Sequence, residues 1–310
     1  MNGDSRPSRD LSNSTGVSGA GSAVVGRVPA PLVFVVSAFS QYLGAGLAVS
    51  LFSLMPSTTV AWWRLVVGAT VLMALRRPWR RSWTRKVLAL AATFGTATAT
   101  MNVIFYAAIS LLPLGTVVSL EFLGPVAVAA VTGRGWRPRC AAVLALLGVV
   151  SISGLGVDLG EPGQRTGVVL ALAAGAAWAG YILLGRRVAS AGVGVDSLAV
   201  GMVFGALVYG PFAVGTAADA LMSVRSTAMA LGVGLLSTAV PYGLDQVVLK
   251  RLGTDTFALL SSLMPATSML VGVAVLGQLP GVWEVTGLVL VSVAVALASV
   301  DGRPPPPRRR

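Results

Sequence analysis

The chain alternates between long apolar runs and short polar or basic segments. The clearest runs, at 32–54, 87–108, 166–185 and 282–300, hold few or no charged residues. Each is about 20 residues long, and a helix that rises 1.5 Å per residue needs about that length to cross ~30 Å of hydrocarbon. The whole pattern predicts ten membrane-spanning helices, at residues 32–54, 57–75, 87–108, 113–132, 140–157, 166–185, 196–216, 228–249, 254–277 and 282–300.

The composition agrees with a helical membrane protein. Hydrophobic residues make up 55% of the chain and charged residues only 11%, with a mean hydropathy of +0.81, whereas soluble domains hold about 25% charged residues. Membrane β-barrels are built from alternating segments of about ten residues, but these runs are continuous. The 37 glycines are scattered through the runs, which favours close packing of helices through small residues. We therefore expect an all-α membrane protein.

The basic residues indicate how the chain is oriented. Of the 23 lysines and arginines, 20 fall in the two tails and in every second loop, two fall in the other loops, and Arg64 lies inside a run. Basic loops face the cytoplasm, so the pattern predicts an even number of spans in the plasma membrane, with both termini cytoplasmic. Residues 1–31 are expected to form a disordered tail and residues 301–310 a basic Pro/Arg tail, both cytoplasmic.

Several function classes are disfavoured by what the sequence lacks. With no histidine and a single cysteine, Cys140, neither a metal site nor an intrachain disulfide is expected. There is no Walker A motif, no Gly-x-Ser-x-Gly elbow and no acidic pair on one span, which argues against an enzyme or a cofactor. The net charge of +12 lies mainly in loops and tails, so nucleic acid is not an expected partner. These features favour a small-molecule transporter in a lipid bilayer, driven by an ion gradient or by exchange; its oligomeric state stays open.

A weak internal repeat divides the predicted spans into two sets of five. A shift of 140 residues places Pro125 on Pro265, each in the fourth span of its set, and it also aligns three leucines, Leu112, Leu120 and Leu123, with Leu252, Leu260 and Leu263. Because five is odd, the second set must enter the membrane in the opposite orientation. The pattern predicts inverted repeats at 32–157 and 166–300, with a site near the midplane between them.

Glu121 is the leading candidate for a functional residue. It lies near the middle of its span, where an ionisable side chain costs about 2.5–3.5 kcal/mol on insertion scales. Pro125 cannot donate a hydrogen bond to the carbonyl four residues back, which is that of Glu121, so a polar notch is expected at this level. Two interpretations stay open: a carboxylate that takes up a proton or binds a substrate amine, and a structural ion pair between helices, with Arg64 as partner.

Two other charged residues lie within the spans. Asp245 is near the cytoplasmic end of its span, where it either contributes to transport or is solvated and paired locally. Arg64 is deeper and faces either a substrate carboxylate or Glu121. Both are included in the predicted substrate site.

Uncharged polar residues complete the predicted site. Asn102 and Tyr106 are four residues apart and therefore share a helix face, and Tyr242 has a polar residue at the same spacing. These side chains either line a cavity or form hydrogen bonds between helices. Ser261 precedes Pro265 and is expected either to join the site or to bond to backbone oxygens that the proline frees.

Several of these residues belong to motifs that resemble a known family. The segments Asn102-Val-Ile-Phe-Tyr-Ala-Ala-Ile109, Leu112-Pro-Leu-Gly115 and Glu121-Phe-Leu-Gly-Pro125 resemble the central signature of the threonine/homoserine exporters, in the drug/metabolite transporter superfamily of EamA type. The second half is similar through Trp178-Ala-Gly-Tyr181, Ser237-Thr-Ala-Val-Pro-Tyr242 and Leu260-Ser-Ser-Leu-Met-Pro-Ala266. The resemblance covers nearly all of residues 32–300. It implies two inverted EamA repeats of five helices each, and export of small amino acids or related metabolites in exchange for protons.

The chain departs from the family pattern in its second half. Met264 and Gln278 stand where acidic residues are usual, and Asp245 stands where a glutamate is usual, which leaves Glu121 as the main carboxylate. We therefore expect a proton-coupled exporter of small neutral amino acids such as threonine or homoserine. The alternatives are a broad-specificity drug or metabolite permease of the same fold and, from another class, a membrane enzyme or a scaffold that does not transport.

Overall fold

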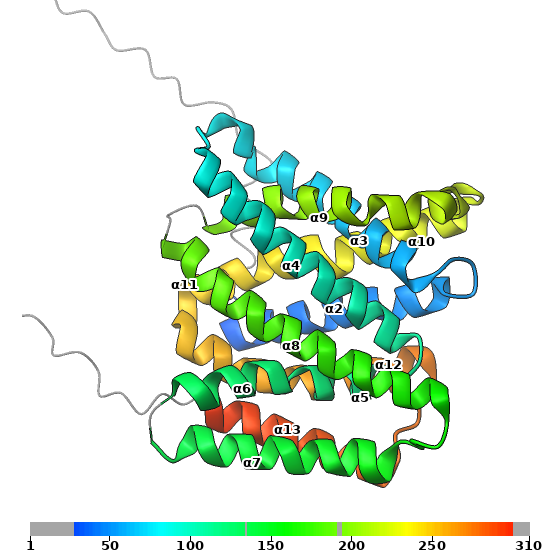
Figure 1. Ribbon diagram of the computed structural model, residues 1–310, viewed down its shortest axis with the longest axis vertical. Coiled ribbons are helices and arrows are strands. Elements are labelled where there is room, and N and C mark those ends of the chain that lie inside the picture. Colours follow the sequence, from blue (N-terminus) through cyan, green and yellow to red (C-terminus); the bar gives the residue numbers. More distant parts are fainter. Residues whose placement is uncertain (1–27, 134, 191–193, 300–310) are drawn as a thin grey trace, which may run out of the picture.

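All regular structure in residues 28–133, 135–190 and 194–299, the parts of the chain described by a computed structural model, is helical (Figure 1). The predicted all-α class is therefore confirmed for these residues. Almost all of the two predicted tails, at 1–31 and 301–310, lies outside the described ranges.

The helices follow the predicted order. We call residues 28–157 the first half and residues 158–299 the second half. The first half contains α2 (Ala30–Leu51), α3 (Ser57–Arg76), η1 (Pro78–Arg80), α4 (Arg85–Ile109), α5 (Leu114–Glu121), α6 (Leu123–Thr132), α7 (Arg137–Val149) and η2 (Val150–Gly156). The second half contains α8 (Pro162–Ser190), α9 (Gly194–Ala217), η3 (Ala218–Leu221), α10 (Val224–Gly234), η4 (Leu235–Ala239), α11 (Val240–Leu260), η5 (Ser261–Leu263), α12 (Met264–Leu276) and α13 (Val282–Ser299).

Eight helical segments in the described residues are long and apolar enough to cross a membrane. They are Ala30–Leu51, Ser57–Arg76, Arg85–Ile109, Leu114–Thr132, Pro162–Leu184, Asp196–Leu221, Val224–Asp245 and Val282–Ser299. The remaining two predicted spans, 140–157 and 254–277, also coincide with helical segments. The first is α7 followed by the π-helix η2, and the second includes a shorter apolar helix, Ser261–Leu276.

Two helices continue through segments that the sequence predicts to be loops. Helix α8 runs to Ser190, beyond the predicted end at residue 185, and α11 runs to Leu260, across the basic segment at 250–253. The reason is that lysine, arginine and leucine are good helix formers, so basic residues that end an apolar run do not end the helix. The charge pattern therefore gives the position of each polar segment but not its conformation.

Helical geometry is interrupted at one residue of the fourth span. Helix α5 ends at Glu121 and α6 begins at Leu123, with Phe122 between them. Pro125 causes the break because it has no N–H to donate to the Glu121 carbonyl. At the position 140 residues later, just before Pro265, the short 3₁₀ turn η5 interrupts the helical run in the same way.

Glycines allow the helices of the two halves to approach closely. A Cβ atom built on Gly95 of α4 would lie 2.0 Å from the carbonyl oxygen of Gly201 on α9. A Cβ atom on Gly124 of α6 would lie 1.9 Å from the carbonyl oxygen of Gly175 on α8. These positions require glycine because the obstructing atoms are backbone.

We expect Gly95→Ala to prevent correct packing of α4 on α9. Neither backbone can yield easily, so the loss should be about 3 kcal/mol or more, the upper range for overpacked cores. Around Gly180 of α8, by contrast, no atom other than the neighbouring backbone of its own helix lies within 4 Å of the position that a Cβ would occupy. Gly180→Ala is therefore the matched control and should be neutral or stabilising by up to about 1 kcal/mol. Thermal unfolding and the yield of monodisperse protein in detergent measure both effects. Equal melting temperatures for the two variants would contradict the prediction.

The helices run between two ends of a bundle. The start of α2 and the end of α13 lie toward the same side, at the left of Figure 1, together with the segment between α3 and α4. We call this the basic end, because residues 76–86 hold six arginines and lysines. The opposite end includes residues 51–57, 109–114 and 276–282. Both described ends of the chain thus lie at the basic end.

Candidate functional site

Arg64 of α3 reaches across to the second half and contacts the π-helix η4. Its Nη2 donates to the carbonyl oxygen of Ser237 at 3.1 Å, and its Nε donates to Thr238 Oγ1 at 3.3 Å. The Ser237 carbonyl lacks its usual α-helical donor because the residue four positions later is Pro241, which has no N–H. A guanidinium is suited to this role because its donors are arranged in a fixed fork.

The same π-helix is held from α2. Ser40 Oγ donates to the carbonyl oxygen of Leu236 at 3.0 Å, and Ser237 Oγ donates to the carbonyl oxygen of Gln41 at 3.3 Å. Gly44 permits this contact, since a Cβ there would collide with Ser237. π-Helical turns often occur at functional sites, and this one brings polar backbone of the second half against α2 and α3.

Glu121 lies in the interior, 7% exposed, at the end of α5. The positive charge of Arg64 acts on its carboxylate, but the two side chains do not form a direct ion pair. Tyr42 of α2 is buried within the electrostatic reach of both groups. The structural ion pair that the sequence left open is therefore not formed, and a buried carboxyl group and a partly buried guanidinium lie near each other without direct contact.

Tyr106 of α4 lies next to Arg64. The centre of the Arg64 guanidinium is 5.5 Å from the centroid of its ring. The side chain is 0% exposed, and its hydroxyl has no hydrogen-bond partner. A buried polar group left unsatisfied costs about 1–3 kcal/mol, so this hydroxyl is available to bond to a polar group of a ligand. We call Arg64, Glu121, Tyr42 and Tyr106 the central cluster.

The other predicted site residues lie outside this cluster or have partners elsewhere. Asn102 is one turn before Tyr106, and its amide donates to the carbonyl of Thr98 in its own helix at 2.8 Å. Asp245 accepts a 2.6 Å hydrogen bond from Ser37 of α2. Ser261 donates to the carbonyl oxygen of Phe257 at 3.0 Å. The carbonyl that lacks its usual donor because of Pro265 is that of Ser261 itself, one turn later.

Tyr242 belongs to a second group, at the basic end. Asp196, at the start of α9, accepts from Arg76 Nε at 3.2 Å and from Arg81 Nη1 at 2.9 Å. Tyr242 lies within the electrostatic reach of Arg76 and Asp196, and its hydroxyl is also buried without a partner. Near the opposite end, Thr59 of α3 bonds to Thr216 of α9 at 2.6 Å. Helices α3 and α9 are thus joined near both ends.

Several polar residues of these groups were not predicted from the sequence. Tyr42 could have been singled out from the sequence, because it follows a glutamine inside the first apolar run. Asp196 stands at the first residue of a predicted span, where a charge is typical of a helix boundary. The described residues contain no group of three or more His, Cys, Asp or Glu side chains that could hold a metal ion.

Comparison with known proteins shows which proteins this chain resembles. Residues 165–300 match the EamA-like transporter family. The threonine/homoserine exporter RhtA of Salmonella typhimurium (strain LT2) is 37% identical over 87% of this chain and 90% of its own length. The exporter of the same name from Escherichia coli (strain K12) is 38% identical over 80% of this chain and 84% of its own length. A solved structure 19% identical to the chain matches with a TM-score of 0.55, over 87% of this chain and 96% of the other, and supports the fold.

Proposed function

Because this chain belongs to the EamA-like transporter family, together with the threonine/homoserine exporters, we propose that it exports small neutral amino acids such as threonine or homoserine in exchange for protons. The chain is a multi-pass membrane transporter and not an enzyme. The observation that carries the proposal is the central cluster, found in a chain that is 37% identical to amino-acid exporters over most of its length.

The central cluster is complementary to an α-amino acid. An amino acid at neutral pH carries an ammonium and a carboxylate on one carbon atom. Glu121 is a partner for the ammonium and Arg64 a partner for the carboxylate, and a ligand between them would complete charge-assisted hydrogen bonds on both sides. The two side chains come from α5 and α3, and Arg64 is itself held by the second half. Such a site would lie between the halves, as expected for inverted repeats.

The proposed topology is ten crossings of the plasma membrane, with the basic end in the cytoplasm. The positive-inside rule supports the orientation, and the shared position of the start of α2 and the end of α13 supports an even count. The matching interruptions at Phe122 and at η5 support two related halves. In this topology the basic end faces the amino-acid supply and the opposite end faces the outside.

Proton exchange follows because Glu121 can bind either a substrate ammonium or a proton. A buried carboxylate is stabilised either by an ammonium or by a proton, and one group can bind only one of them at a time. Competition between the two would make outward movement of substrate depend on inward movement of protons. Asp245, a partly buried acid, is already bonded to Ser37, so Glu121 is the better candidate for this exchange.

The proposal is tested by transport in proteoliposomes of purified protein. Labelled threonine and homoserine should exchange by counterflow, and net flux should follow an imposed pH gradient. A panel that includes unrelated cationic drugs separates an amino-acid exporter from a broad permease of the same fold. No counterflow of any amino acid would refute the proposal, and equal fluxes of drugs and amino acids would favour the permease.

Tyr106 is expected to select substrates that carry a hydroxyl group. Tyr106→Phe removes only the unpartnered hydroxyl and keeps the ring beside Arg64. The variant should raise the KM for threonine and homoserine about tenfold, the usual order for a lost hydrogen bond in a buried site. The KM for 2-aminobutyrate, which lacks the hydroxyl, should not change.

Tyr242→Phe is the matched control for this substitution. It removes the other buried tyrosine hydroxyl without a partner in the described residues, and that hydroxyl lies near Arg76 and Asp196. We expect Tyr242→Phe to leave the ratio of the KM for threonine to the KM for 2-aminobutyrate unchanged. If Tyr106→Phe also leaves this ratio unchanged, Tyr106 does not form a hydrogen bond with the substrate hydroxyl.

A further inference from the structure

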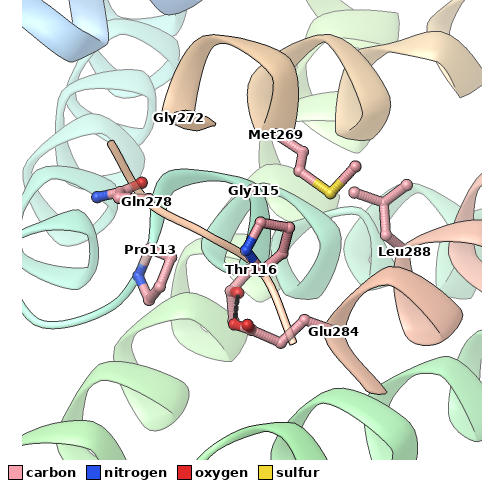
Figure 2. Close-up of a pocket in the computed structure, with 9 residues that line it drawn as sticks. Pro113, Gly115, Thr116, Met269, Gly272, Gln278, Glu284 and Leu288 are labelled. Carbon is pink, nitrogen blue, oxygen red and sulfur yellow. Dashed lines mark hydrogen bonds between the residues drawn. The ribbon is translucent and has the colours of Figure 1, made fainter. Parts of the chain in front are cut away.

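A group of polar contacts at the opposite end joins α5 to the segment that connects α12 with α13. Thr116 Oγ1 donates to Glu284 Oε1 at 2.5 Å, and the Gly281 N–H donates to Glu284 Oε2 at 2.9 Å. The N–H of Leu114, the first residue of α5, donates to Gln278 Oε1 at 3.0 Å. Figure 2 shows the Thr116–Glu284 contact, with Gln278 above Pro113 at the left of the view. Both acceptor side chains belong to the second half, and both donors on α5 belong to the first.

These contacts cover a small pocket. Its volume is about 20 Å³, and it is partly open to solvent. It is lined by Pro113, Gly115, Thr116, Met269, Gly272, Gln278, Pro280, Glu284 and Leu288. On its inner side the backbones of α5 and α12 nearly touch, since a Cβ built on Gly115 would lie 2.9 Å from the Cα of Met269. The end of the bundle is therefore closed here by a few contacts on one turn of α5.

Helix α5 connects these contacts to the central cluster. It is a single helix of eight residues with Thr116 in its first turn and Glu121 as its last residue. The two side chains are five residues apart, about 7.5 Å along the axis. Beyond Glu121 the α-helix is interrupted at Phe122, because Pro125 leaves the Glu121 carbonyl without its usual partner. Backbone hydrogen bonds from Phe122 to Val118 and from Val126 to Phe122 still link the two helices, so Phe122, where the Glu121 carbonyl lacks its usual partner, is the point about which α5 can bend relative to α6.

We propose that Glu284 and Gln278 form a latch that closes this end of the transport path, and that α5 is the part that moves when the latch opens. The inference rests on the proposed function and names the residues that control release from the site. Opening exchanges the two contacts on α5 for hydrogen bonds to water, which any exposed helix N-terminus makes. The closed and open states therefore differ little in free energy, as a gate requires. A turn of α5 about Phe122 would move Glu121 at the same time.

The first test measures opening of the pocket without any substrate. Met269→Cys places a thiol in the pocket, and Cys140→Ser removes the native thiol, which is exposed. In this background Thr116→Val and, separately, Glu284→Gln should raise the rate of maleimide labelling in detergent about tenfold, as expected for loss of a hydrogen bond to a charged group. Thr166→Val is the matched control, since the Thr166 hydroxyl bonds only within its own helix, to Pro162. Unchanged labelling rates in both latch variants would overturn the proposal.

The second test restrains the latch. In the Cys140→Ser background, Thr116→Cys and Glu284→Cys are joined by a short, reducible bifunctional thiol reagent. Counterflow of threonine should fall at least about tenfold in the cross-linked protein and return after reduction, while the two single variants treated with the reagent should change much less. Equal flux before and after reduction would overturn the latch. If the wild-type protein shows no counterflow of any amino acid but the labelling rates change as expected, the proposed function fails and the latch stands.

Discussion

Replacing Glu121 by glutamine is expected to abolish export driven by a pH gradient while leaving the protein folded in the membrane. Glutamine has nearly the same shape, so the packing of the α5 terminus is preserved. It can neither take up a proton nor carry the negative charge that faces Arg64. Net flux of threonine in proteoliposomes should fall at least about tenfold, since a charged partner in a buried site contributes that much or more.

The assay also separates the two roles proposed for this carboxylate. If Glu121 only carries the proton, counterflow without a pH gradient persists in Glu121→Gln; if it also binds the substrate ammonium, counterflow is lost too. Glu161→Gln is the control, because Glu161 is exposed and immediately precedes α8, and its side chain accepts a hydrogen bond from the nearby Gln164, in the first turn of that helix. Wild-type net flux in Glu121→Gln would remove Glu121 from the mechanism.

The features that depend on local chemistry could be predicted from the sequence. The length of the apolar runs located every described helix that is long enough to cross a membrane, because 1.5 Å per residue and the hydrocarbon thickness fix that length. The notch at Glu121 was predictable as well, since a proline always leaves the carbonyl four residues earlier without its partner. The helix does break there, between Glu121 and Leu123.

The partners of these groups were not predictable, because they come from distant parts of the chain. Pro241 marks the Ser237 carbonyl as free, yet its donor is Arg64, 173 residues earlier. Thr116 and Glu284 are 168 residues apart. Such contacts depend on the rotation of each helix about its axis and on its depth relative to its neighbours. A hydropathy pattern that is apolar all round does not encode that rotation.

Charged residues at the ends of the predicted spans gave the least information about function. Asp196 and Glu284 stand at span ends, where solvated acids are common, and neither was singled out as functional. In the structure Asp196 binds two arginines at the basic end, and Glu284 accepts two hydrogen bonds at the opposite end. Both lie where the two halves meet. Acidic residues at span ends thus stabilise contacts between helices, in addition to any role in setting topology.

Replacing Arg64 by glutamine is expected to cause the second large loss of transport. The change removes the positive charge beside Glu121 and the donors to Ser237 and Thr238. Without this charge, a buried carboxylate is left uncompensated, at a cost of about 2.5–3.5 kcal/mol on insertion scales. We therefore expect a lower melting temperature in detergent and at least a tenfold loss of threonine counterflow.

The double variant Arg64→Gln with Glu121→Gln separates folding from function. Because it contains neither of these two ionisable groups, it should recover most of the thermal stability lost in Arg64→Gln while its counterflow stays low. Arg64→Lys keeps the charge but has no planar fork, so it should retain stability better than glutamine does and still bind substrate weakly. If the double variant is no more stable than Arg64→Gln, the two charges do not compensate each other. If Arg64→Gln transports threonine at the wild-type rate, Arg64 does not bind the substrate carboxylate.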